Sequence, residues 1–126
     1  MSLNKVLIID DEPLILKSTS MILKYSGFDM LTAIDGFDGL KLAESEVPNL
    51  ILLDLMMPGI NGWDVLAKLK ENPVTASIPV IIFTAKEYTT EETQEYSSKV
   101  NDFIQKPFTP AHLIEIIKKH IQKSDS

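Results

Sequence analysis

The sequence feature that most constrains the fold is a run of four apolar residues, 50–53, that ends directly in a carboxylate, Asp54. A run this short, with no polar residue alternating through it, is typical of a β-strand buried on both faces of a sheet. Asp54 would then stand at the carboxyl end of that strand, the edge at which open α/β sheets bind their ligands. An Asp before a Pro-Gly turn is also a common turn residue, so Asp54 taken alone would be structural.

Four further segments predict strands of the same sheet. Residues 6–9 and 80–83 are continuous apolar runs like 50–53 and indicate strands covered on both faces. Residues 28–33 and 101–105 mix apolar with polar residues, which favours positions at the two edges of the sheet.

Five helices are expected between and after these strands. Pro13 and Gly27 bound the first, the Asp35-Gly36 turn precedes the second, and the third covers residues 63–71. A capping-box pattern at 89–92 begins a weakly apolar fourth helix, and Thr109-Pro110 begins the last. The apolar residues expected on the packed faces are Leu14, Met21, Ile22 and Tyr25, then Phe37, Leu40 and Ala43, then Val65, Leu66 and Leu69, and finally Leu113, Ile114, Ile117 and Ile121.

Strands that alternate with helices predict an α/β fold with a parallel sheet, helices on both of its faces and right-handed crossovers. A chain of 126 residues fits one domain, with an ordered core over about residues 4–122 and no output domain.

Composition narrows the class of function. The chain has no Cys, which excludes a disulfide framework and thiolate metal sites. Its net charge of −6 argues against a nucleic-acid-binding surface. Neither a targeting segment nor an apolar run of membrane-spanning length is visible, so we expect a cytoplasmic protein with no membrane contact.

Polar residues follow four of the predicted strands: Asp10 and Asp11, Asp54, Thr84 and Lys106. In a parallel sheet these strand ends share one edge, so the side chains converge. Carboxylates packed together raise one another's pKa unless a cation intervenes, and an all-oxygen set suits Mg²⁺. A metal ion, an ammonium group and a hydroxyl suit an incoming phosphoryl group, for which a carboxylate can be the covalent acceptor. Each residue alone has a commoner structural explanation, but their joint placement favours a site.

The motifs at 6–13 (VLIIDDEP), 54–62 (DLMMPGING), 83–85 (FTA) and 103–108 (FIQKPF) resemble the receiver domain of two-component response regulators. The resemblance covers essentially the whole chain. It implies a three-layer, flavodoxin-like (βα)5 fold, in which a doubly wound parallel sheet of five strands has the order 2-1-3-4-5. It also implies a frequent cis peptide bond between Lys106 and Pro107.

The same resemblance assigns the site. It makes Asp54 the phosphoacceptor for a histidine kinase's phosphohistidine. Asp11, Asp54 and the backbone carbonyl of Met56 would bind Mg²⁺ directly, and Asp10 would bind it through water. Lys106 would pair with a phosphoryl oxygen. Thr84 would bond another oxygen and move inward, and Phe103 would be the switch aromatic that turns inward with it.

Some residues depart from the family pattern. Phe103 stands where Tyr is common, so an output contact there must be apolar. Lys99-Val100 replaces a frequent Gly-Ala before the last strand. Met56 and Lys86 occupy positions that influence loss of the phosphoryl group in this family, and we expect these long side chains to hinder attacking water and slow hydrolysis.

The resemblance implies a signalling switch rather than an enzyme, a domain that promotes only its own phosphorylation and dephosphorylation. The charge change at Asp54 would bias a two-state surface built from the weak fourth helix, the last strand and the last helix. Its partners would be a sensor histidine kinase or a histidine phosphotransfer protein, and an output partner or fused domain. Phosphorylation-dependent dimerisation, the cognate kinase and the output are left open.

Other functions fit the residues less well. A Mg²⁺-dependent phosphohydrolase with an aspartyl phosphate places its nucleophile after the first strand, with a second Asp two residues on, where this chain has Glu12. A phosphorylation-independent binding module would not need the five site residues. A flavin-binding protein would need a phosphate loop after the first strand. His112 and His120 are predicted to be surface residues, and Trp63 is predicted to pack against the sheet.

Overall fold

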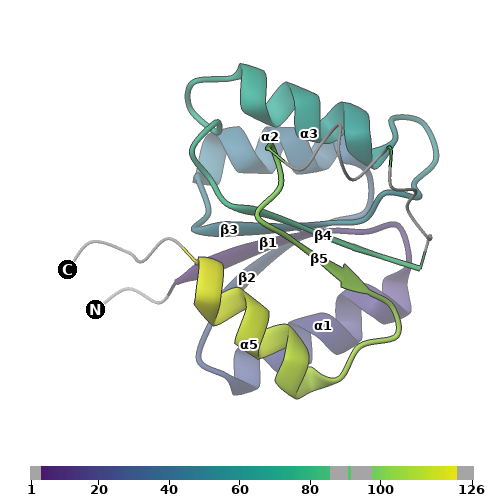
Figure 1. The fold of residues 1–126 in the computed structure, drawn as a ribbon, viewed down its shortest axis with the longest axis vertical. Coiled ribbons are helices and arrows are strands. Elements are labelled where there is room, and N and C mark those ends of the chain that lie inside the picture. Colours follow the sequence, from purple (N-terminus) through teal and green to yellow (C-terminus); the bar gives the residue numbers. More distant parts are fainter. Residues whose placement is uncertain (1–3, 86–90, 92–97, 122–126) are drawn as a thin grey trace.

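The computed structural model describes residues 4–85, 91 and 98–121. Five strands alternate with helices in these parts of the chain, which are labelled in Figure 1. The strands are β1 (Lys5–Ile9), β2 (Asp29–Ala33), β3 (Leu50–Leu53), β4 (Val80–Thr84) and β5 (Asp102–Gln105). The described helices are α1 (Pro13–Tyr25), α2 (Gly36–Glu46), α3 (Gly62–Glu71) and α5 (Pro110–His120). The helix predicted to begin near Thr89 lies outside the described residues, apart from Glu91.

All strand pairs are parallel, and the order is β2-β1-β3-β4-β5, as predicted. β1, β3 and β4 lie inside the sheet and are almost wholly buried, whereas the edge strands β2 and β5 are partly exposed. The continuous apolar runs therefore correctly predicted the central strands, which are covered on both faces. The mixed segments correctly predicted the two edge strands, which are partly exposed.

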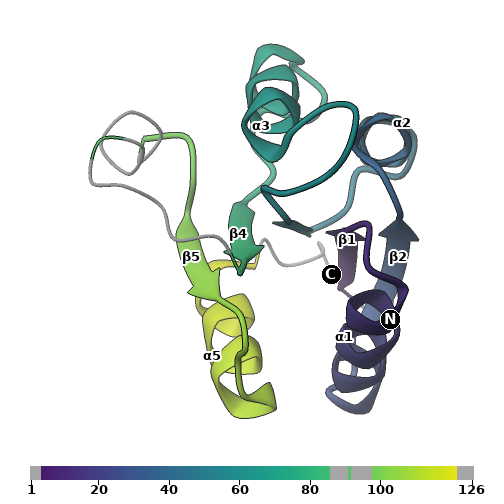
Figure 2. The same cartoon turned by 90° about the vertical axis from the view of Figure 1, so that its right-hand side faces the viewer.

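Helices cover both faces of the sheet, so the molecule has three layers. Figures 1 and 2 show α2 and α3 on one face and α1 and α5 on the other. Successive residues of a strand point to opposite faces. Leu7 and Ile9 of β1 accordingly belong to the core beneath α2 and α3, while Val6 and Ile8 belong to the core beneath α1 and α5. None of the described helices has the length and apolarity needed to cross a membrane.

The predicted packed face of α1 was wrong. The buried residues of this helix are Leu16, Thr19 and Leu23, whereas Leu14, Met21 and Tyr25 are exposed. Apolar residues occur on several sides of α1, so their spacing alone did not identify the side that meets the sheet. Ile22 lies between the two sides and is half-buried against the core.

Phe37 of α2 was also predicted to pack inward, and it is exposed. The buried positions of this helix include Gly36, Gly39 and Ala43. A side chain at Gly39 would begin 2.5 Å from the Ile9 side chain, so α2 approaches the sheet more closely than a Phe at the contact would allow. The inward residues predicted for α3 are buried as expected, and α5 buries Ile116 in addition to Leu113 and Ile117.

Candidate functional site

The carboxyl edge of the sheet aligns four of the polar residues singled out from the sequence. Backbone pairing continues one residue past the strands: Asp54 N–H donates to Ile9 O at 3.0 Å, and Lys106 N–H donates to Thr84 O at 2.9 Å. Asp10, Asp54, Thr84 and Lys106 therefore lie side by side at the carboxyl ends of the four neighbouring strands β1, β3, β4 and β5. The backbone register, rather than any side-chain contact, brings them together.

Lys106 bridges the two buried carboxylates of this edge. Its Nζ lies 2.5 Å from Asp10 Oδ2 and 3.8 Å from Asp54 Oδ2. Asp10 and Asp54 are almost completely inaccessible, and the Lys106 side chain is 8% exposed. The ammonium group also stands 4.7 Å from the centroid of the Phe83 ring. The peptide bond between Lys106 and Pro107 is cis, as predicted.

Asp54 is held in an electrostatically unfavourable place for a carboxylate. Burial raises the pKa of Asp54 above its ordinary value of 3.8. The charge of Lys106 lowers this pKa, the neighbouring Asp10 raises it, and hydrogen bonds from Thr84 and from the Met56 N–H lower it. The net effect is a raised pKa, so the site would gain from further positive charge near Asp54.

Three carboxylates lie close enough together to share such a charge. One oxygen each from Asp10, Glu12 and Asp54 lies within 4.8 Å of the other two. The Glu12 N–H also donates to Asp10 Oδ1 at 2.9 Å. An all-oxygen donor set at one edge, with a carboxylate whose ionised form is disfavoured, fits a hard divalent cation such as Mg²⁺. These residues could bind a metal ion.

Glu12 is the site residue that the sequence analysis did not assign. The acidic run 10–12 was visible, but it gave no reason to choose among its members. Asp11, the predicted metal ligand, is half-exposed and is not part of the three-carboxylate cluster. Which of these carboxylates joins the cluster depends on the direction in which each side chain points after β1, and the sequence does not specify that direction.

The loop after Asp54 is fixed by its glycines. Gly59 has a φ of 85°, a conformation that favours glycine. A side chain at Gly62 would begin 2.5 Å from Asp54 O and 2.6 Å from Leu55 Cα, so α3 begins directly against the backbone of Asp54 and Leu55. Met56 follows with an exposed side chain, and its N–H lies 3.3 Å from Asp54 Oδ1.

The remaining predicted residues lie around this edge. Thr84 is buried and hydrogen-bonds Asp54. Phe103 is half-buried and packs against the core beneath α2 and α3, as does Trp63, whose predicted packing is confirmed. His112 is exposed as predicted. His120 is only half-exposed and lies with Nε2 2.9 Å from Asp102 Oδ2, so it joins α5 to β5.

Comparison with known proteins identifies the family of this chain. The family described as "Response regulator receiver domain" matches residues 6–118. The chain belongs to this family. It is a receiver domain of two-component response regulators, and therefore a signalling domain.

The receiver domain is similar to proteins of different lengths. The "DNA-binding dual master transcriptional regulator RpaA" of Synechocystis is 35% identical over 121 residues, which make up 96% of this chain and 50% of that protein. "Protein PilG" of Pseudomonas aeruginosa is 35% identical over 117 residues, 93% of this chain and 87% of that protein. The solved N-terminal domain of a receiver protein from Methanoculleus marisnigri has a TM-score of 0.80 at 37% identity, covering 98% of this chain and 100% of that one. The chain thus spans about half the length of RpaA.

Proposed function

We propose that Asp54 is the phosphoacceptor of this receiver domain. The observation that carries the proposal is the environment of its carboxylate: buried at the carboxyl edge, 3.8 Å from the Lys106 ammonium and hydrogen-bonded by Thr84. An Asp54 oxygen attacks the phosphorus of a phosphohistidine, a new O–P bond forms as the N–P bond breaks, and the imidazole leaves with the bonding electrons.

Lys106 and Thr84 would bind the transferred group. The Lys106 ammonium lies 3.8 Å from Asp54 Oδ2 and can offset the negative charge of a phosphoryl group carried by this carboxylate. The Thr84 hydroxyl already reaches the Asp54 carboxylate and can donate to a phosphoryl oxygen instead. Asp10 holds the Lys106 ammonium at this edge through the shorter of the two ion pairs.

Mg²⁺ is the proposed cofactor, and it would supply positive charge to offset that of the phosphoryl group. We propose that Asp11, Asp54 and the backbone carbonyl of Met56 hold it directly and that Asp10 contributes through water. The closeness of Glu12 to Asp10 and Asp54 supports a further role for that carboxylate. Mg²⁺ affinity, measured calorimetrically in Asp11→Asn and Glu12→Gln, separates the two. Asp11→Asn should weaken binding at least tenfold and Glu12→Gln less, and the reverse order would move the ligand role to Glu12.

Phosphorylation adds about one and a half to two negative charges at a buried position, which can bias a two-state surface. Thr84 on β4 and Phe103 on β5 lie on neighbouring strands, so an inward movement of Thr84 would reach Phe103, β5 and α5. We propose that this surface signals to an output partner or fused domain. The phosphoryl donor would be a cytoplasmic histidine kinase or histidine phosphotransfer protein, and the domain would catalyse only its own phosphorylation and dephosphorylation.

The test is the intact mass of the protein after incubation with acetyl phosphate, with and without Mg²⁺. Wild type should gain one phosphoryl group only with Mg²⁺, and Asp54→Asn should gain none. Asp64→Asn, which removes an exposed carboxylate from the first turn of α3, is the matched control and should behave as wild type.

A second donor makes the result decisive. A phosphorylated histidine phosphotransfer domain should transfer its group to wild type and not to Asp54→Asn. If neither donor labels the folded wild type, the domain is a phosphorylation-independent binding module. If wild type releases phosphate continuously from small phosphate esters, it is a phosphohydrolase.

A further inference from the structure

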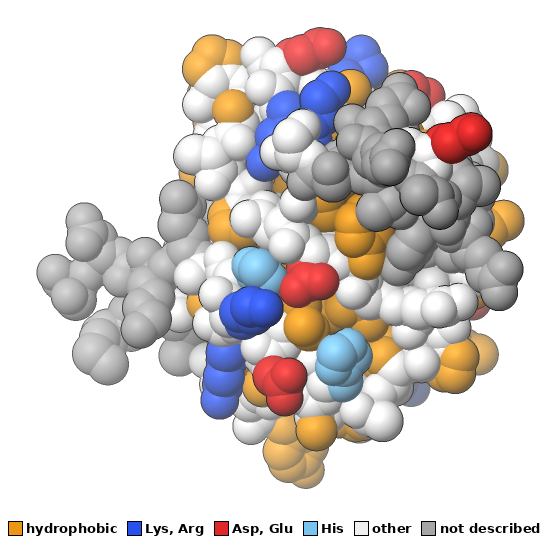
Figure 3. Space-filling view, viewed as in Figure 1, with side chains coloured by type: hydrophobic (Ala, Val, Ile, Leu, Met, Phe, Trp, Pro, Cys, Tyr) orange, Lys and Arg blue, Asp and Glu red, His pale blue; other side chains and the backbone are white. Residues whose placement is uncertain are grey.

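The Lys106 ammonium has an aromatic neighbour in addition to its two carboxylates. Its Nζ lies over the ring of Phe83, 4.7 Å from the ring centroid. The face of an aromatic ring attracts a cation that lies within about 6 Å, and the attraction grows when water is excluded. Lysine ammonium groups ordinarily lie in water, as those at the surface over α3 and α5 do (blue in Figure 3). The Lys106 side chain is only 8% exposed, so its contact with Phe83 is largely desolvated.

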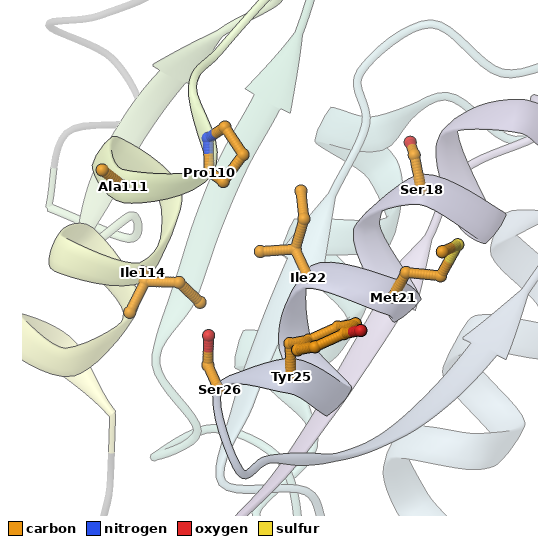
Figure 4. Close-up of a pocket in the computed structure, with 8 residues that line it drawn as sticks. All are labelled: Ser18, Met21, Ile22, Tyr25, Ser26, Pro110, Ala111 and Ile114. Atoms are coloured by element: carbon orange, nitrogen blue, oxygen red, sulfur yellow. The ribbon is translucent and has the colours of Figure 1, made fainter.

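The Phe83 ring is held in place by its surroundings. Phe83 is the last apolar residue of β4, pairs in register with Ile104 of β5 and is completely buried. Its ring packs against Phe108, with the ring centroids 6.3 Å apart and the ring planes inclined by 42°. Phe83 belongs to the core beneath α1 and α5, against which Ile22 and Ile114 pack as they point toward one another between these helices (Figure 4). A ring packed in this way offers the ammonium a rigid surface.

A third fixed contact restricts the position of the ammonium. The Lys106 side chain is long and flexible, and its Nζ lies nearer to Asp10 than to Asp54. Contacts with two fixed points leave a group free to move around the line that joins them, and a third contact removes that freedom. Phosphorylation of Asp54 would change the charges on the carboxylate side, whereas the Phe83 ring carries no net charge and takes no part in the transfer. Its attraction for the ammonium would therefore persist throughout.

We propose that Phe83 is a positioning residue for phosphoryl transfer, and that the face of its ring holds the Lys106 ammonium beside Asp54. This role rests on the proposed function, because transfer to Asp54 is the step that a well-placed ammonium accelerates. Phe83 acts through Lys106 and needs no contact with the reacting atoms. The competing explanation is that Phe83 only fills the core. In that case the volume of its ring would matter, and the electron density of the ring would not.

Fluorinated phenylalanines at position 83 separate these two explanations. Fluorine withdraws electron density from the face of the ring and changes its size little, so it weakens the attraction for a cation while packing is nearly kept. The rate constant for phosphorylation by acetyl phosphate with Mg²⁺, followed by intact mass, should fall with each added fluorine. The fall should reach about fivefold for 3,4,5-trifluorophenylalanine.

Phe28 provides the matched control. It is buried in the same core as Phe83, but it precedes β2 at the edge of the sheet opposite to Asp54. The same fluorinated residues at position 28 should leave the rate constant near that of wild type. The exchange to a natural residue should follow the same order: Phe83→Leu should slow phosphorylation at least about fivefold, and Phe28→Leu should not.

A double-mutant cycle shows whether the effect of the ring depends on the ammonium. Phe83→Leu is compared in the wild-type chain and in Lys106→Met by urea unfolding in EDTA, which does not require phosphorylation. Phe83→Leu should lower the urea midpoint by about 0.5 M more in the wild-type chain, because the attraction between ring and ammonium is lost only there.

Three results would each overturn the role of Phe83. These are a rate constant that trifluorination at position 83 leaves unchanged, an equal loss of rate in Phe83→Leu and Phe28→Leu, and equal midpoint shifts for Phe83→Leu in the two backgrounds. A folded wild type that accepts no phosphoryl group would overturn the proposed function of Asp54, and this role with it. A wild type that is phosphorylated at a rate indifferent to the ring would overturn the role of Phe83 alone.

Discussion

Replacing Lys106 by Met is the perturbation that most directly exposes the electrostatics of the site. The substitution keeps the length of the side chain and its contact beside Phe83, but it removes the ammonium that lies 2.5 Å from Asp10 and 3.8 Å from Asp54. Asp10 and Asp54 then remain as two buried carboxylates without the cation that separates them. We expect the folded domain to lose stability at neutral pH in the absence of divalent ions.

The size of the loss follows from the burial of the pair. Removing one partner of a buried ion pair costs about 3–5 kcal/mol, because the other charge stays behind uncompensated. The Glu12 N–H still donates to Asp10 Oδ1 at 2.9 Å, which places the expected loss at the lower end, about 3 kcal/mol. A domain of this size is stable by about 5–15 kcal/mol, so the variant should fold and its loss should be measurable.

Urea unfolding in EDTA, followed by the fluorescence of the single Trp63, measures this difference. For an urea dependence of about 2 kcal/mol/M, a loss of about 3 kcal/mol lowers the midpoint by about 1.5 M. Lys68→Met, at an exposed position of α3, should stay within about 0.5 kcal/mol of wild type. Mg²⁺ at a hundred times its dissociation constant should return about 2.7 kcal/mol to the Lys106 variant. Equal midpoints for wild type and Lys106→Met in EDTA would refute the reasoning.

Three further predictions concern Asp54 and the loop that follows it. Because the folded pKa of Asp54 is raised, the stability that this residue provides below pH 3.8 is lost as the pH rises through its folded pKa. Asp54→Asn should therefore be more stable than wild type at pH 7 in EDTA, by a margin that vanishes near pH 3.8 in pH-dependent unfolding curves. Gly62→Ala should cost about 2–3 kcal/mol in the same unfolding assay, because its side chain meets backbone atoms of Asp54 and Leu55 that cannot move aside. Met56→Asn should lose its phosphoryl group faster than wild type in a time course of intact mass, since the exposed Met56 side chain follows Asp54 closely, and slower loss would contradict this.

Sequence alone predicted the strands and their polar ends, because both depend on local pattern. A buried parallel strand must be apolar on both faces, so the first polar residue after runs 6–9, 50–53 and 80–83 marks the sheet edge. The parallel register then places Asp10, Asp54, Thr84 and Lys106 side by side without further information. This part of the site could be predicted for the same reason as the fold.

Side-chain direction and helix orientation could not be predicted in the same way. In α1 the packed side includes the polar Thr19, while the apolar Met21 and Tyr25 face outward, so hydrophobic spacing pointed to the wrong side. Glu12 lies close to Asp10 and Asp54, and His120 lies beside Asp102. Both contacts depend on three-dimensional packing, which the sequence pattern does not specify. A prediction that assumes apolar residues are buried is wrong where a helix exposes large apolar side chains, as α1 does at Leu14, Met21 and Tyr25.

The most direct test of the account is chemical location of the phosphoryl group. After incubation with acetyl phosphate and Mg²⁺, borohydride reduces an aspartyl phosphate to homoserine, and peptide mass spectrometry identifies the residue that changed. The account predicts homoserine at position 54 alone. Its amount should fall to background without Mg²⁺ and should be much reduced in Lys106→Met. Reduction at position 10, 11 or 12, or a phosphoryl group that survives on Asp54→Asn, would contradict it.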